Sequence, residues 1–116
     1  MIIFPYGFYI LDGRSPIYVG NDLEAQDTVR AWLDANPEKV RLGLDVIGPV
    51  RISTRFLGWN EQPRSGSMDP GPFLFETTLD GAPDIVTRRL YRDYDAASTG
   101  HVELVALARQ RLDGKR

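Results

Sequence analysis

The most regular pattern in the chain is an alternation of core-type and polar side chains over residues 50–56. One set would face a core: Val50, Ile52, Thr54 and Phe56. The intervening set is polar: Arg51, Ser53 and Arg55. Because successive side chains of a β-strand point to opposite faces, the segment is predicted to be a strand with one buried side and one solvent-facing side. A sheet with one wet face indicates antiparallel strands.

Shorter patterns of the same kind predict further strands along the chain. They cover residues 8–11, 17–19, 42–46, 73–79 and 85–91. The third of these rests on the alternation of Leu42, Leu44 and Val46. Residues with turn chemistry separate the strands: Gly13 and Pro16, the pair Gly48-Pro49, and the pair Asp80-Gly81.

Two segments have the three- and four-residue spacing of an amphipathic helix. The first is predicted to begin at Asn21 as N-cap, with Glu24 completing a capping box, and to end before Pro37. Its buried stripe is Ala25, Val29, Trp32 and Leu33. The second is predicted to begin at the cap Asp95, and its stripe is Ala97, His101, Leu104, Val105, Ala108 and Leu112. Gly100 costs this helix about 1 kcal/mol relative to alanine, which indicates a packing reason for the glycine.

These elements predict an α+β domain, in which an antiparallel sheet of about four to six strands is covered on one face by two helices. The 116 residues are expected to form one domain. A chain of this length buries roughly two-thirds of its unfolded surface, enough for a core without disulfides or metals.

The segment 60–72 interrupts the periodic pattern. It contains prolines and glycines throughout: Pro63, Gly66, Pro70, Gly71 and Pro72. So long a loop within a compact domain is usually either functional or disordered. Trp59 at its root, Arg64 within it and Met68 near its tip belong to residue types enriched at protein interfaces. The loop is therefore either a recognition element or a connector.

The amino-acid composition limits the kinds of active site, metal site and partner that are expected for this chain. The chain has no cysteine, which excludes disulfides, thiolate metal sites and cysteine nucleophiles, and His101 is its single histidine, so we expect no metal and no cofactor. The net charge of −2 is too balanced for bulk attraction to nucleic acid. The N-terminal segment lacks a basic stretch and no segment approaches the length of a membrane span, so the expected location is the cytoplasm, away from membranes.

Two segments carry a resemblance: ISTRFLG at residues 52–58 and GPFLFET at residues 71–77. With the opening strand, the Trp32 helix and the Gly100-His101 pair, they resemble a family of small uncharacterised bacteriophage, prophage and bacterial proteins. Members of that family often have a histidine after the first segment, where this chain has residues 59–62 without one, and a bulky apolar pair with glycines after the second, where this chain has residues 78–81. The resemblance implies a phage-linked origin and no particular chemistry.

Two residues are weak candidates for catalysis. Glu76 lies opposite the apolar face of its strand, where it would be either a general base with a raised pKa or a cross-strand partner of Arg51, Arg55 or Arg88. His101 lies on the apolar stripe of the last helix, as either an acid–base group or a packing residue that donates to a backbone carbonyl. No other residue pattern supports an enzyme.

Arginines and aromatic residues suggest a binding face. Five arginines would line one side of the sheet beside Trp59 and Tyr91: Arg51, Arg55, Arg88, Arg89 and Arg92. Interleaved arginine and aromatic side chains bind single-stranded nucleic acid, although a solvated, charged face has the same composition.

The favoured hypothesis is a small phage-type accessory protein that binds a host or bacterial protein stoichiometrically, for instance to inhibit a defence factor. Nucleic-acid binding through the arginine face is the alternative, and a small enzyme using Glu76 or His101 is the third hypothesis. An exposed edge strand near the N-terminus would also permit a homodimer.

Overall fold

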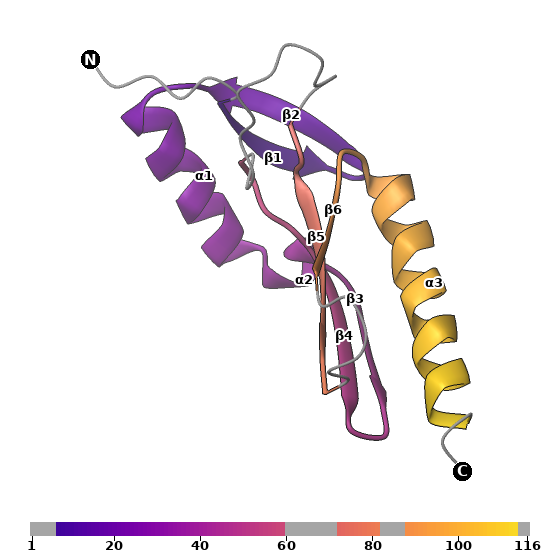
Figure 1. The fold of residues 1–116 in the computed structure, drawn as a ribbon. Coiled ribbons are helices and arrows are strands. Elements are labelled where there is room, and N and C mark those ends of the chain that lie inside the picture. The colour runs from indigo at the N-terminus through magenta and orange to yellow at the C-terminus, as the bar shows by residue number, and fades with distance from the viewer. Residues whose placement is uncertain (1–6, 60–71, 82–87, 114–116) are drawn as a thin grey trace.

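The computed structural model describes residues 7–59, 72–81 and 88–113. Its elements follow in this order: β1 (Phe8–Asp12), β2 (Ser15–Gly20), α1 (Leu23–Ala35), α2 (Pro37–Val40), β3 (Arg41–Ile47), β4 (Val50–Phe56), β5 (Phe75–Asp80), β6 (Arg88–Tyr91) and α3 (Tyr94–Asp113) (Figure 1). Residues 60–71 of the predicted loop, with Arg64 and Met68, and residues 85–87 of the last predicted strand lie outside the described residues.

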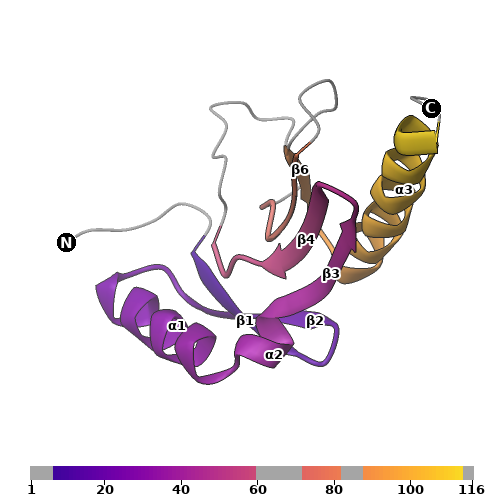
Figure 2. The same cartoon turned by 90° about the horizontal axis from the view of Figure 1, so that it is seen from below.

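The α+β class with antiparallel strands is confirmed, but the strands form two sheets. Strands β1 and β2 make a hairpin, and a separate four-stranded sheet has the order β3-β4-β5-β6. Helix α3 packs on the four-stranded sheet, whereas α1 packs on the hairpin. The two helices therefore lie on opposite sides of the strands (Figures 1 and 2), and not together on one face as the sequence suggested.

The predicted alternation in β4 is confirmed by its burial. Its core-type residues face α3 and are buried: Val50, Ile52, Thr54 and Phe56. On β5, Phe75 pairs with Phe56, Thr77 with Thr54 and Leu79 with Ile52. Leu104 and Ala108 of α3 complete this core. Each fully buried large apolar side chain contributes roughly 1.5–3 kcal/mol, so this face supplies most of what holds α3 to the sheet.

A second part of the core joins the two sheets. The ring of Phe56 packs against Trp32 of α1 and Phe75 of β5, with centroid distances of 6.0 Å and 5.3 Å. The buried stripe predicted for α1 is confirmed, because Val29 is buried against Phe8 of β1. Leu11 of β1 belongs to the same buried cluster as Phe56 and Phe75, so the hairpin packs directly against the four-stranded sheet.

Strand β3 is confirmed, but its two faces are not set by simple alternation. The pairing with β4 shifts register between Arg41 and Gly43. A register irregularity of this kind changes which side chains face inward. Leu44 and Val46 consequently point away from α3 and are 38% and 68% exposed, and Asp45 takes the side that faces the helix.

Both predicted helix caps are wrong by one or two residues. The side chain of Asp22, and not of Asn21, accepts a hydrogen bond from the backbone N of Ala25, so Glu24 does not complete a capping box. Helix α3 begins at Tyr94, and Asp93, and not Asp95, accepts from the backbone N of Ala96 at 2.7 Å. All four of these residues are asparagine or aspartate, which both suit an N-cap, so the position at which the chain leaves the preceding strand decides which one is used.

The packing reason predicted for Gly100 is confirmed. A Cβ atom at this position would overlap the ring and hydroxyl of Tyr91. Tyr91 therefore lies on the side of β6 that faces α3, and its hydroxyl is buried with no hydrogen-bond partner among the described residues.

We expect Gly100→Ala to lower the free energy of unfolding by about 1–3 kcal/mol, although alanine favours a helix, because the added methyl overpacks against Tyr91. Tyr91→Phe should recover part of that loss and should not itself destabilise, since it removes a buried hydroxyl without a partner. Urea unfolding measures both, with the exposed neighbour Thr99→Ala as control. An unchanged midpoint in Gly100→Ala would contradict the close approach of Tyr91.

Candidate functional site

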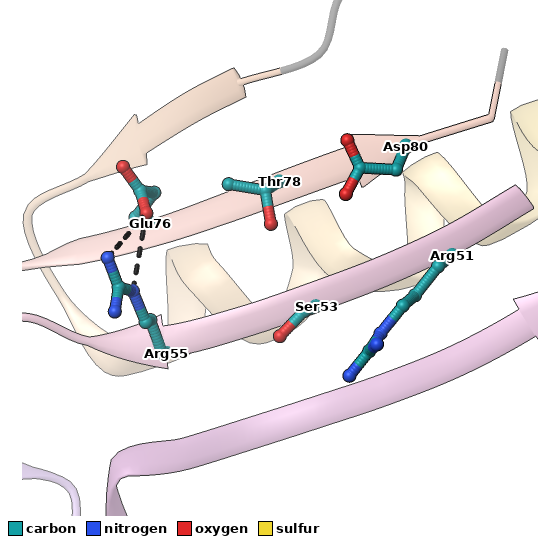
Figure 3. Close-up of a pocket in the computed structure, with 6 residues that line it drawn as sticks. All are labelled: Arg51, Ser53, Arg55, Glu76, Thr78 and Asp80. Carbon is teal, nitrogen blue, oxygen red and sulfur yellow. Dashed lines mark hydrogen bonds and ion pairs between the residues drawn. The ribbon is translucent and has the colours of Figure 1, made fainter.

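The four-stranded sheet has one face that α3 does not cover. We call it the open face, and it comprises Leu44, Val46, Arg51, Ser53, Arg55, Glu76, Thr78, Asp80, Arg88 and Leu90. These are the positions whose neighbours along each strand face α3. Six of them, from β4 and β5, line a shallow depression of about 260 Å³ (Figure 3).

Glu76 lies at one end of this depression as the carboxylate of an ion-paired cluster. Arg55 Nε donates to its Oε1 at 3.3 Å, and Arg88 Nε donates to its Oε2. Glu76 is only 4% exposed, whereas both arginines reach solvent. Because arginine engages both carboxylate oxygens, the geometry is that of a cross-strand ion pair and not of a general base poised for a substrate.

Arg51 differs from Arg55 and Arg88. It lies opposite Asp80 in the pairing of β4 with β5, yet its side chain extends away from that carboxylate towards β3 (Figure 3). Among the described residues it forms no ion pair. The exposed side chains of Leu44 and Val46 lie on the adjacent strand. The open face thus places an unpaired cation beside apolar surface.

A groove of about 440 Å³ continues from the open face towards α1 and α2. Its apolar lining includes Leu33, Val40, Leu57 and Trp59. Its charged side chains are Asp34 on the helix side and Arg41 and Arg55 on the sheet side. Ser53 and Arg55 line both the groove and the depression, so the two form one surface.

Trp59 is held at the end of the groove by its backbone. It forms an isolated antiparallel bridge with Phe8, and the neighbouring Gly58 carbonyl accepts a 2.8 Å hydrogen bond from the backbone N of Tyr9. Trp59 is 37% exposed. The hairpin therefore fixes the position of a large aromatic residue at the surface.

His101 lies on the opposite side of the sheet, in a chain of side-chain hydrogen bonds. Its Nε2 is 2.7 Å from Asp45 Oδ2, its Nδ1 is 2.7 Å from Thr54 Oγ1, and Thr54 Oγ1 is 2.5 Å from Thr77 Oγ1. A Cβ at Gly43 would come within 3.0 Å of the imidazole, so the glycine admits the ring. The sequence suggested that His101 donates a hydrogen bond to a backbone carbonyl, but both of its ring nitrogens instead contact the side chains of Asp45 and Thr54.

An acid, a histidine and a hydroxyl in series are also the parts of an activated nucleophile. Here Thr54 and Thr77 are both completely buried, so no substrate can reach either hydroxyl. Glu76 and His101 lie on opposite faces of the sheet and form no dyad. The chain of hydrogen bonds satisfies polar groups in the core and ties α3 to β3 and β4.

The structure brings together only part of the predicted binding face. Arg51, Arg55 and Arg88 lie on it, whereas Tyr91 faces α3. Arg89 approaches Glu103 of α3 at 4.0 Å, and Arg92 lies over the ring of Phe73, with its Cζ atom 4.0 Å from the centroid. Sequence reasoning missed the groove residues Arg41 and Val40 and the exposed pair Leu44 and Val46. The alternation of Leu44 and Val46 was visible, but their outward direction follows from the register shift in β3.

Within residues 7–59, 72–81 and 88–113, no group of three or more histidine or acidic side chains is placed to hold a metal ion. No helix in this part of the chain is long and apolar enough to cross a membrane. Comparison with protein-family models, with curated proteins and with solved structures finds no match to this chain.

Proposed function

We propose that this protein is a stoichiometric protein-binding module, and that the open face with the adjoining groove is its binding surface. The observation that carries the proposal is the exposed Arg51, which forms no ion pair among the described residues, beside the exposed Leu44 and Val46 on a sheet face that none of the described helices covers. Arginine and tryptophan are the residue types that most often dominate binding energy at protein interfaces, and Trp59 borders the same surface.

Charge supports a partner with acidic side chains. Arg41 and Arg51 form no ion pair among the described residues, and Arg55 and Arg88 remain partly exposed although they engage Glu76. Acidic side chains of a partner would form ion pairs with Arg41 and Arg51, and the positive charge would steer such a partner towards the surface. Inhibition of a host or bacterial defence factor is the specific form of this proposal that the phage-family resemblance favours.

Nucleic acid is the weaker candidate for this surface. Binding of single strands needs aromatic side chains on which bases stack. The three aromatic residues of strands β3 to β6 all face α3: Phe56, Phe75 and Tyr91. Of the two aromatic residues that line the groove, Phe56 is buried and only Trp59 is exposed.

The test is capture of partners from nuclease-treated bacterial lysate, followed by reconstitution of the complex from purified components. We expect a one-to-one complex that Arg51→Glu weakens by about tenfold or more, because reversing the charge places repulsion at the centre of the interface. Arg109→Glu is the matched control, because it makes the same charge change at an exposed position of α3. Equal weakening of the complex by both variants would contradict binding of the partner at the open face. Recovery of partners only from lysate without nuclease treatment would contradict direct protein binding.

A homodimer through the N-terminal hairpin stays a separate prediction. Ile17 and Tyr18 of β2 are among the exposed large apolar residues, which supports it. Sedimentation of the purified protein over a range of concentrations tests this association independently of any captured partner.

A further inference from the structure

The groove has the size and lining of a ligand site. Its volume of about 440 Å³ lies within the range of about 300–1,000 Å³ that is usual for ligand pockets. Phe56 and Leu57, both buried, form part of its lining, and Leu33 and Val40 come from the helical side. Trp59 adds an aromatic surface. Such a lining favours insertion of aliphatic or aromatic groups.

The charged residues of the groove are arranged asymmetrically. Arg41 and Arg55 lie on the sheet side, and Asp34 lies on the helix side. Arg41 forms no ion pair within the described part of the chain, and Arg55, although bonded to Glu76, is 58% exposed at its side chain. The planar guanidinium group of each arginine can donate to both oxygens of a carboxylate. The sheet side therefore favours an anionic group next to the apolar lining.

From this combination we infer that the groove binds a short extended peptide segment of the partner, with an apolar anchor side chain over Leu57 and Trp59 and an acidic side chain at Arg41. The inference rests on the proposed function and adds the chemistry of the partner's binding segment. A buried aromatic or aliphatic anchor with a flanking charge is the usual composition of a binding hot spot. Asp34 lies across the groove and repels the same acidic side chain, so its removal should favour binding.

The experiment titrates the full-length protein with blocked tetrapeptides of the pattern acidic–apolar–apolar–acidic, using Asp or Glu and Leu, Ile, Phe or Tyr. The control peptides replace the acidic residues by lysine or the apolar residues by serine. Two-dimensional NMR follows the indole N–H of Trp59 and the amides of Val40 and Ser53. We expect saturable shifts, with members of the first set binding about tenfold or more tightly than either control.

Two single substitutions with opposite expected effects sharpen the test. Arg41→Glu should weaken binding of the best acidic peptide by about tenfold, and Asp34→Asn should strengthen it by about twofold to threefold. Lys39→Glu, on the exposed side of α2, matches the charge change of Arg41→Glu and should have a smaller effect. Equal binding of acidic and basic peptides, no shift at these positions, or shifts produced instead by oligothymidylate would overturn the inference.

Failure of this inference is distinguishable from failure of the proposed function. If Arg51→Glu abolishes the reconstituted complex while Arg41→Glu and Trp59→Ser leave it unchanged, the open face binds the partner and the groove does not. If the acidic peptides occupy the groove but no one-to-one protein complex forms, the ligand chemistry of the groove holds and the protein-binding function fails.

Discussion

His101→Ala is expected to destabilise the fold by about 2–4 kcal/mol. The substitution removes a buried ring and leaves Thr54 and Asp45 without their common partner. Both effects have known sizes, because a buried polar group that loses its hydrogen bond costs about 1–3 kcal/mol and a core cavity adds to that. Since a domain has only about 5–15 kcal/mol of total stability, urea unfolding followed by circular dichroism should detect the loss easily.

The matched control for His101 is Asp45→Asn. Its amide oxygen can still accept from Nε2, and the Asp45 side chain is 45% exposed, so we expect a loss below about 1 kcal/mol. A wild-type midpoint in His101→Ala would mean that the hydrogen-bond chain does not hold α3 to the sheet. That result would favour a functional role for the imidazole over a structural one.

Phe56→Ala is expected to have the largest effect, a loss of about 3–5 kcal/mol. Phe56 is buried and contacts Trp32 of α1 on one side and Phe75 of β5 on the other. Its removal would leave a cavity where the hairpin half meets the four-stranded sheet. Because Phe56 also lines the groove, the acidic peptides should bind this variant more weakly even where it remains folded.

Urea unfolding should be followed for Phe56→Ala by both circular dichroism and tryptophan fluorescence, because Trp32 directly contacts the deleted ring. Val46→Ala, on the open face and well exposed, is the control and should change stability by less than about 0.5 kcal/mol. A loss below about 1.5 kcal/mol in Phe56→Ala would show that the two halves are joined mainly by other contacts.

Together these contacts account for the functional conclusion. The polar residues that looked most like catalytic groups, Glu76 and His101, are both engaged in hydrogen bonds that stabilise the fold. Arg51 and Arg41, in contrast, are exposed and form no ion pair within the described part of the chain, and we propose that they take part in recognition. Because Glu76 and His101 are engaged within the fold while these arginines are exposed, we favour a binding surface over an active site.

The sequence by itself determined the features that depend on neighbouring residues. Alternation identified β4 and its two faces, helical spacing identified the stripes of α1 and α3, and turn-forming residues marked the ends of the hairpins. Gly100 in mid-helix correctly indicated a close contact. These features follow from the period of a strand or helix and from the conformations open to glycine and proline, which are local properties.

Only the tertiary structure decided the features that join distant residues. The register shift in β3 turned Leu44 and Val46 outward and Asp45 towards His101, 56 residues further along the chain. The division into two sheets placed α1 beside the open face and so created the groove between Asp34 and Arg41. Strand pairing and burial minimise the free energy of the whole chain, so no window of neighbouring residues could have determined which charged side chains form ion pairs within the fold and which stay exposed.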